Sequence, residues 1–129
     1  MLPIDFTGST SFSDDKPVSY YITDIPKDFI CMDIGHMTLD MVKDEFIDVK
    51  TLFWNGPIGV YEFSNYQKGT LELMKFVSSN ISNTIIGGGD IISCASNLSM
   101  IDKFSYVSTG GGATLSYLSN KKQPGLSNM

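Results

Sequence analysis

The sequence has little positive charge, and this shortage excludes one class of partner. Nine basic residues are scattered among fourteen acidic ones, so the net charge of the 129-residue chain is −5. Because nucleic-acid binding needs lysine and arginine clustered on one face, we expect no nucleic-acid partner. No apolar run approaches the length of a membrane span, and the start of the chain has neither a basic segment nor a long apolar core. We therefore expect no membrane partner, no signal peptide and a cytoplasmic location.

Residues suited to metal binding or nucleophilic catalysis are also few. Two cysteines, Cys31 and Cys94, lie far apart without metal-like spacing, and we expect two reduced, packed thiols. A catalytic triad would need His36, the only histidine, for which a structural or surface role is favoured. The chain also lacks the Gly-Lys-Ser/Thr of a Walker A loop and the Gly-x-Gly-x-x-Gly of a dinucleotide site.

The apolar pattern that is present predicts an α/β fold. A 42% apolar and 18% charged composition is typical of a globular protein, and the length suits one compact domain. Short apolar runs predict strands at residues 4–6, 20–22, 29–34, 51–54, 84–86 and 104–107, with a loop over 8–18. Helical spacing predicts helices over residues 39–46, 66–77 and 91–98 and a last one ending at Leu118. Apolar strands that alternate with helices indicate a parallel sheet, whose ligands lie beyond the carboxyl ends of its strands.

The strongest local signal is a predicted strand that runs into Gly87-Gly88-Gly89-Asp90 and then a helix. Consecutive glycines let backbone N–H groups converge on an anion, and the helix N-terminus adds partial positive charge. Asp90 offers an oxygen to Mg²⁺; alternatively, the glycines only permit a tight turn and Asp90 caps the helix. A second corner, Gly110-Gly111-Gly112, lies within 26 positions of the first. Together they favour two N-termini aimed at one anionic ligand.

A third turn, residues 54–62, reads Trp-Asn-Gly-Pro-Ile-Gly-Val-Tyr-Glu. In this turn Pro57 and Val60 offer apolar surface to a flat ring, Asn55 a polar contact and Glu62 an acceptor for ribose hydroxyls. The alternative interpretation makes Trp54 a core anchor and Glu62 an ordinary exposed acid.

In their order and spacing, these motifs resemble phosphoglycerate kinases. The matching segments are residues 54–62, 68–70, 85–90 and 107–115, with Leu2-Pro3-Ile4-Asp5-Phe6, Asp24-Ile25-Pro26, Met32-Asp33-Ile34-Gly35 and Pro124-Gly125. The resemblance covers essentially the whole chain. It implies a three-layer Rossmann-like parallel sheet with helices on both faces, present as an incomplete domain. Residues 1–129 would be the C-terminal portion of the nucleotide-binding domain, with a C-terminal tail over residues 120–129.

The resemblance also implies an activity: phosphoryl transfer between 1,3-bisphosphoglycerate and Mg-ADP, giving 3-phosphoglycerate and Mg-ATP in glycolysis. It also implies Mg²⁺ as cofactor. The residues that would bind ADP or ATP are Asn55, Gly56, Pro57, Val60, Glu62, Gly87, Gly88, Gly89, Asp90 and Ile91. Asp90 would contact the metal, and the amides of Gly88, Gly89, Gly111 and Gly112 would face the nucleotide phosphates and the migrating phosphoryl group. The phosphoglycerate would bind an N-terminal domain that these residues do not include, so the isolated chain is expected to be inactive.

Several residues depart from the family pattern. Ile91 stands where Thr or Ser is usual, Ser116 where Glu is usual and Asn120 where Gly is usual, and His36-Met37 replaces Pro-Lys. These departures keep a second hypothesis open, in which the chain is a degenerate, non-catalytic relic that binds nucleotide or protein only. A third is an unrelated small α/β domain.

Overall fold

A computed structural model describes residues 1–120, and these form two compact units rather than the single domain that the sequence predicts. Unit 1 comprises Met1–Val49 and Pro57–Ile81. Unit 2 comprises Lys50–Gly56 and the chain from Ser82 onward. Apart from Asn120, the predicted tail lies outside the described residues, and so does the Pro124-Gly125 match.

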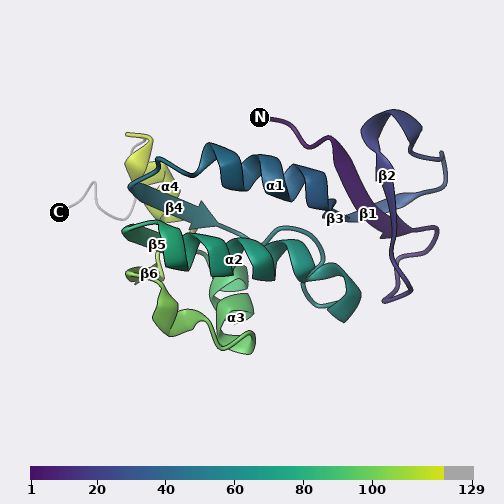
Figure 1. The fold of residues 1–129 in the computed structure, drawn as a ribbon. Helices are drawn as coiled ribbons and strands as arrows, with labels where there is room; N and C mark the ends of the chain where they lie inside the picture. Colours follow the sequence, from purple (N-terminus) through teal and green to yellow (C-terminus); the bar gives the residue numbers. More distant parts are fainter. Residues whose placement is uncertain (121–129) are drawn as a thin grey trace. The chain divides into compact units, whose positions relative to one another are not determined.

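Unit 1 combines an antiparallel sheet with two helices (Figure 1). In the sheet, β1 (Asp5–Ser9) lies between β2 (Val18–Tyr21) and β3 (Ile30–Ile34). Two longer helices, α1 (His36–Glu45) and α2 (Lys68–Asn80), lie side by side, and the short 3-10 helices η1 (Ile22–Asp24) and η2 (Ser64–Tyr66) complete the unit. Its buried apolar side chains are Met32, Leu39, Tyr66, Leu73, Met74, Val77 and Ile81.

The prediction of a parallel sheet is wrong for unit 1. The connections from β1 to β2 and from β2 to β3 hold no α-helix and span only residues 10–17 and 22–29. Parallel neighbours need a crossover of a dozen residues or more, so the short loop after β1 enforces antiparallel pairing with β2, and β3 pairs antiparallel with the other side of β1.

A buried carboxylate in β1 caps helix α1. The amides of Thr38 and Met37 donate to the two Asp5 carboxylate oxygens at 2.8 and 3.2 Å, and the Thr38 hydroxyl donates at 2.5 Å. The N-cap residue, Gly35, has no side chain that could do this. Burial raises the pKa of Asp5, but the hydrogen bonds from Thr38 and Met37 outweigh it and leave the pKa below its ordinary value. The sheet therefore supplies the cap of this helix.

Helix α2 is capped in the same way by Asp33 of β3. The Gly69 amide, in the first turn of α2, donates to Asp33 Oδ2 at 2.9 Å, and the Ile34 amide donates to Oδ1 at 2.8 Å. The carboxylate is 5% exposed. Burial raises the pKa of Asp33 to about 6 against the opposing effect of these two hydrogen bonds, and the charge of Glu72 adds to the rise.

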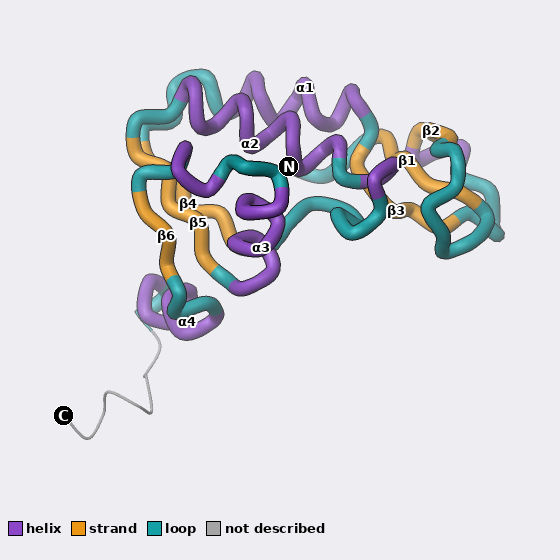
Figure 2. Tube along the Cα trace, turned by 90° about the horizontal axis from the view of Figure 1, so that it is seen from below, coloured by secondary structure: helices purple, strands orange, loops and turns teal. Residues whose placement is uncertain are grey.

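Unit 2 holds the parallel sheet, and here the α/β prediction is confirmed. The strands β4 (Thr51–Asn55), β5 (Asn83–Gly87) and β6 (Tyr106–Ser108) are neighbours in that order (Figure 2). Helix α3 (Gly89–Asn97) follows β5, and α4 (Gly112–Leu118) follows β6 after the 3-10 helix η3 (Ile101–Lys103). The buried apolar residues of unit 2 are Ile86, Ile91, Cys94, Ala95 and Phe104.

Two expectations about single side chains have different outcomes. Cys94 is buried as predicted, but Cys31 is exposed, so the prediction of a packed thiol is wrong there. His36, with an exposed side chain at the first position of α1, has the surface role that was favoured. Among the described residues, no helix is long and apolar enough to cross a membrane.

We predict that the stability of the chain carries a pH dependence from Asp33. Because the folded state binds this proton more tightly than the unfolded state, the contribution of Asp33 is fully present below the ordinary pKa of 3.8 and is lost as pH rises through about 6. The unfolding free energy of wild type relative to Asp33→Asn should therefore fall by about 2 kcal/mol between pH 4 and 7. Urea denaturation at each pH measures it, and a pH-independent difference would contradict the prediction.

Candidate functional site

The carboxyl ends of the three strands of unit 2 lie at one edge of the sheet. The strand register pairs Asn55 with Gly87 and Gly87 with Ser108, which are the last residues of β4, β5 and β6. Each strand end is followed by a glycine-containing corner. The expectation that these turns share one edge is confirmed.

The corner after β5 can be formed only by glycine. Gly88 has φ 101° and ψ 144°, a conformation that residues with a Cβ rarely adopt. The Asn55 side-chain amide donates to the Gly87 carbonyl oxygen at 2.8 Å, and a Cβ on Gly88 would lie 3.0 Å from that same nitrogen. Asn55 therefore closes the corner from the neighbouring strand, a role that the sequence did not predict.

The corner after β6 lies directly against the corner after β5. Gly111 has φ 52°, and a Cβ built on it would be 3.8 Å from the Gly88 Cα atom. The hydroxyls of Ser108 and Thr114 lie 2.8 Å apart, and a Cβ on Gly110 would come within 2.3 Å of the Thr114 hydroxyl oxygen. The two triple-glycine corners therefore adjoin, and the shared anionic ligand stays a prediction.

Two glycines at these corners have no steric reason to be glycine. A Cβ built on Gly89 or Gly112 would meet no heavy atom of the described residues within 4 Å, and neither residue has a positive φ. Both are exposed, at the first position of α3 and of α4. The first amides of a helix have no partner within the helix, and Gly88, the N-cap of α3, has no side chain to cap them. Absence of a Cβ at Gly89 leaves these amides open to close approach.

Asp90 and Ile91, both in the first turn of α3, differ in their exposure to solvent. The Asp90 side chain is exposed, whereas Ile91 is fully buried in the core. Among residues 1–120, no group of three or more histidine, cysteine or acidic side chains is placed to hold a metal. The exposed Asp90 carboxylate supplies one oxygen ligand of the kind that Mg²⁺ takes, and Mg²⁺ is commonly bound through one or two carboxylates plus phosphates. Ile91 can face a ligand only through its backbone amide.

The remaining predicted site residues are divided between the two units. Gly56, with φ 79°, accepts a hydrogen bond from the Trp54 indole at 2.6 Å within unit 2. Pro57, Val60 and Glu62 belong to unit 1, where Pro57 and Val60 are half-buried and Glu62 is exposed. The structure therefore brings together Asn55, Gly87, Gly88 and Gly111 within one unit, and Pro57, Val60 and Glu62 in a loop of the other.

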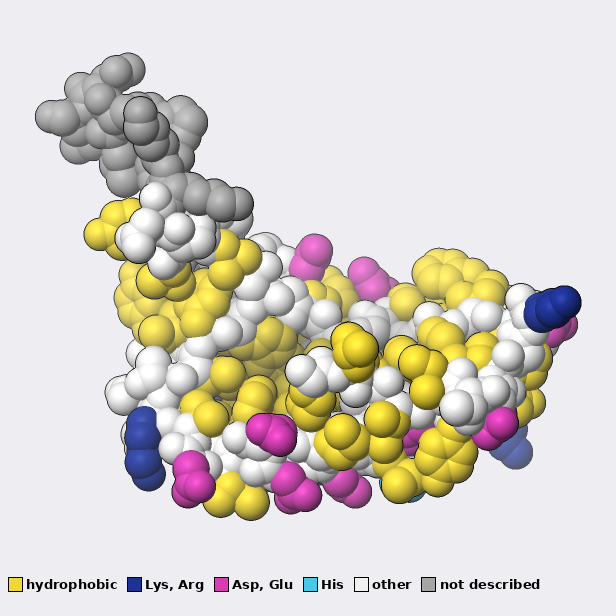
Figure 3. Space-filling model, turned by 90° about the horizontal axis from the view of Figure 1, so that it is seen from above, with side chains coloured by type: hydrophobic (Ala, Val, Ile, Leu, Met, Phe, Trp, Pro, Cys, Tyr) yellow, Lys and Arg dark blue, Asp and Glu magenta, His cyan; other side chains and the backbone are white. Residues whose placement is uncertain are grey.

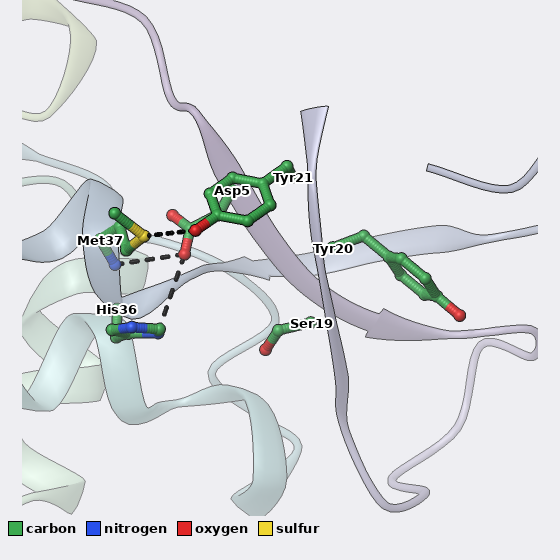
Figure 4. A pocket seen from close by; sticks show the side chains of 6 residues that line it. All are labelled: Asp5, Ser19, Tyr20, Tyr21, His36 and Met37. Atoms are coloured by element: carbon green, nitrogen blue, oxygen red, sulfur yellow. Dashed lines mark hydrogen bonds and ion pairs between the residues drawn. The ribbon is translucent and has the colours of Figure 1, made fainter. Parts of the chain in front are cut away.

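A separate cavity in unit 1 offers no comparable chemistry (Figure 4). It is lined by Asp5, Ser19, Tyr20, Tyr21, His36 and Met37. The Asp5 carboxylate is already used as the cap of α1 and lies 3.8 Å from His36 Nδ1, and the Tyr21 hydroxyl donates to the Met37 sulfur at 3.0 Å. Figure 3 shows acidic side chains spread among hydrophobic and polar ones, with few lysines on that face. Neither the cavity nor the face drawn in Figure 3 shows a cluster of basic side chains.

Comparison with known proteins identifies the family. The family model for phosphoglycerate kinase matches residues 1–121. This chain belongs to the phosphoglycerate kinase family. It is 43% identical over 129 residues to the phosphoglycerate kinase of Oenococcus oeni, covering 98% of this chain and 32% of the relative, and 43% identical over 131 residues to that of Listeria welshimeri, covering 100% and 33%.

Solved phosphoglycerate kinases have the same fold over the matched part. The structure from Coxiella burnetii aligns with a TM-score of 0.88 at 33% identity, covering 94% of this chain and 32% of that one. The structure from Pyrococcus horikoshii aligns with a TM-score of 0.78 at 25% identity, covering 95% and 30%. The chain thus spans about a third of the length of the phosphoglycerate kinases it matches.

The departures from the family pattern have local explanations in three cases. Asn120 stands where the family has glycine and adopts φ 57°, a left-handed conformation that asparagine tolerates. His36 replaces proline at the first position of α1, where proline is favoured but not required. Ile91 replaces a hydroxyl residue and joins the buried core. Nothing in the structure explains Ser116.

We predict opposite effects on stability at adjacent glycines. Gly88→Ala forces a Cβ into a positive-φ position against Asn55 and should lower the free energy of unfolding by about 1–3 kcal/mol. Gly89→Ala meets open space and should leave it unchanged or slightly higher. Urea denaturation of both variants measures the contrast. Equal losses would show that Gly89 is also required by the fold.

Proposed function

We propose that this chain forms part of the nucleotide site of a phosphoglycerate kinase, with the nucleotide phosphates at the adjoining corners of unit 2. The observation that carries the proposal is the pair of exposed glycines, Gly89 and Gly112, where a Cβ atom would meet no atom of residues 1–120 within 4 Å. Such glycines are expected where a ligand approaches the backbone closely. The first turn of α3 adds open amides and a partial positive charge, which suit a phosphate.

The roles at the phosphate end follow from this arrangement. The amides of Gly88 and Gly89 face the nucleotide phosphates, with those of Gly87, Asp90 and Ile91 beside them. The amides of Gly111 and Gly112, in the adjoining corner, face the migrating phosphoryl group. Asp90 contacts the Mg²⁺ of the bound nucleotide, and Mg²⁺ supplies neutralisation of phosphate charge. Phosphoryl transfer depends mainly on positioning and electrostatic stabilisation, so fixed amides are the contribution expected of this chain.

The other end of the nucleotide is assigned by the family resemblance. Asn55, Gly56, Pro57 and Val60 are proposed to line the adenosine site, and Glu62 to accept hydrogen bonds from the ribose hydroxyls. Glu62 is exposed and Val60 half-buried, which suits these roles. The Asn55 side chain already donates to Gly87, so its contact with the nucleotide would use its remaining polar atoms.

The complete reaction is part of the same proposal. It is the transfer of a phosphoryl group between 1,3-bisphosphoglycerate and Mg-ADP, giving 3-phosphoglycerate and Mg-ATP, a glycolytic step of the cytoplasm. The chain spans about a third of its relatives, and residues 1–129 are proposed to be the C-terminal portion of the nucleotide-binding domain. The phosphoglycerate would bind the remaining part of such an enzyme, so the 129-residue chain alone should bind nucleotide without turnover.

We predict that Asp90 contributes to nucleotide binding only when Mg²⁺ is present. Asp90→Asn should raise the Kd for Mg-ADP about tenfold, the effect expected when a charged contact is lost. The Kd for ADP in EDTA should be the same for wild type and variant. Fluorescence of Trp54, the only tryptophan and a neighbour of Asn55, measures binding.

Asp102→Asn is the matched control, because Asp102 is an exposed acid of the same unit at a distance along the chain from the corners. It should bind Mg-ADP as wild type does. An equal Kd for Mg-ADP in wild type and Asp90→Asn would remove Asp90 from the metal site.

We further predict activity when the chain is supplied with the rest of an enzyme. In a chimera, it replaces the aligned segment of the Listeria welshimeri phosphoglycerate kinase, to which it is 43% identical. A coupled assay with 3-phosphoglycerate and Mg-ATP should show turnover. Gly89→Ala should lower kcat/KM at least tenfold, since its Cβ obstructs the phosphates. The control Ser93→Ala, at an exposed position of the same helix, should not.

The chimera also tests the competing hypothesis of a non-catalytic relic. A folded chimera that binds Mg-ADP but shows no turnover would support the relic, in which the buried Ile91 replaces a lost hydroxyl. A chimera whose turnover is unaffected by Gly89→Ala would show that the open glycine corner is not where the phosphates bind.

A further inference from the structure

The loop of residues 57–63 is joined to helix α2 by a reciprocal pair of hydrogen bonds. The Ile58 amide donates to Thr70 Oγ1 at 3.0 Å, and the Thr70 hydroxyl donates back to the Ile58 carbonyl oxygen. Thr70 is fully buried, so water cannot take the place of its hydroxyl. One side chain thus satisfies both backbone groups of Ile58.

The same loop is joined to the sheet of unit 1 beside Asp33. The Val60 amide donates to the Met32 carbonyl oxygen at 2.7 Å. Gly59 approaches so closely that a Cβ on it would lie 2.6 Å from the Met32 carbonyl oxygen and 2.7 Å from Asp33 Oδ1. The other oxygen of this carboxylate accepts the Gly69 amide of α2 at 2.9 Å. Loop, strand β3 and the first turn of α2 therefore meet at one buried carboxylate.

The backbone of this loop would be loosely defined without these contacts. Gly56, which precedes it, has φ 79°, and Gly59 within it has φ 67°. Glycine is the residue with the greatest freedom in the unfolded chain, so a single loop conformation must be imposed by partners outside the loop. Thr70 and Asp33 are buried side chains in position to impose it.

We propose that Thr70 and Asp33 are positioning residues that hold the loop of residues 57–63 in the shape that binds the adenosine end of the nucleotide. This inference rests on the proposed function, which gives adenosine and ribose contacts to Pro57, Val60 and Glu62. Thr70 acts through Ile58 and Asp33 acts through Gly59, and neither is assigned a contact with the ligand. Because the phosphate corners belong to unit 2, loss of the loop contacts weakens adenosine binding selectively.

Calorimetric titration of the 129-residue chain with Mg-ADP and with Mg-pyrophosphate, which has no adenosine, tests this selectivity. Thr70→Val keeps the shape of the side chain and loses both hydrogen bonds, so it should raise the Kd for ADP about tenfold and leave that for pyrophosphate unchanged. Thr70→Ser keeps the hydroxyl and should behave as wild type with both ligands. Asp33→Asn is a second, independent variant that should show the same split as Thr70→Val.

Thr84→Val is the matched control for general destabilisation. Thr84 is also buried and paired through its hydroxyl, with the Ser105 amide at 3.1 Å in unit 2, at the start of β5 rather than at its carboxyl end. Its ratio of ADP to pyrophosphate affinity should match that of wild type. If the role of Thr70 were merely structural, Thr70→Val would weaken the binding of ADP and of pyrophosphate by the same factor, as expected for the control.

Hydrogen exchange of the unliganded chain supplies a readout independent of binding. The Ile58 and Val60 amides should exchange about tenfold faster in Thr70→Val than in Thr70→Ser. Two results would overturn the positioning role alone, provided that wild type binds ADP. In the first, Thr70→Val binds ADP as well as wild type does; in the second, Thr70→Val loses affinity for ADP and pyrophosphate equally. Wild type that binds pyrophosphate and ADP with equal affinity, or binds neither, would overturn the proposed adenosine site itself and this inference with it.

Discussion

The in-register parallel pairing of β4, β5 and β6 is the constraint on which the candidate site depends. Parallel hydrogen bonding places Asn55, Gly87 and Ser108 at the same level of the sheet, so the turns that follow must share one edge. A shift by one residue would reverse the direction of every side chain on the shifted strand and remove Asn55 from the Gly87 carbonyl. The glycines then allow Gly88 and Gly111 to approach within contact distance. The register of the three strands therefore determines the geometry of the candidate site.

Unit 1 relies on a different device, the capping of helices by carboxylates from a sheet. Asp5 and Asp33 lie on neighbouring strands, and each accepts amides from the first turn of a helix. The two carboxyl groups nevertheless differ in pKa. Hydrogen bonds outweigh burial and lower the pKa of Asp5, whereas burial outweighs hydrogen bonds and raises the pKa of Asp33. The Asp33 cap also lies against Gly59, so the same group that starts α2 contacts the loop of residues 57–63, for which adenosine contacts are proposed.

The sequence predicts unit 2 well because its signals are local. Apolar runs that end in triple glycine identify both a strand and its direction, and the register follows from the burial of the sheet. The sequence does not predict the antiparallel sheet of unit 1, because Thr7 and Gly8 interrupt the apolar pattern of β1 and no local signal shows that β1 pairs with both β2 and β3. No local pattern shows that Asp33 caps α2 or that Thr70 pairs with Ile58, although both lie in segments that match the family. Such contacts depend on tertiary packing.

The exposed glycines at the start of α3 have a consequence for how such a chain tolerates genetic change. A ligand held by peptide N–H groups depends on atoms that every residue except proline supplies. Most missense changes around Asp90 would therefore leave the donors in place, and replacement of the Gly88–Gly89 pair itself would be the damaging event. Ile91 is buried, so its side chain can differ without removing the backbone amide that is proposed to lie beside the phosphates.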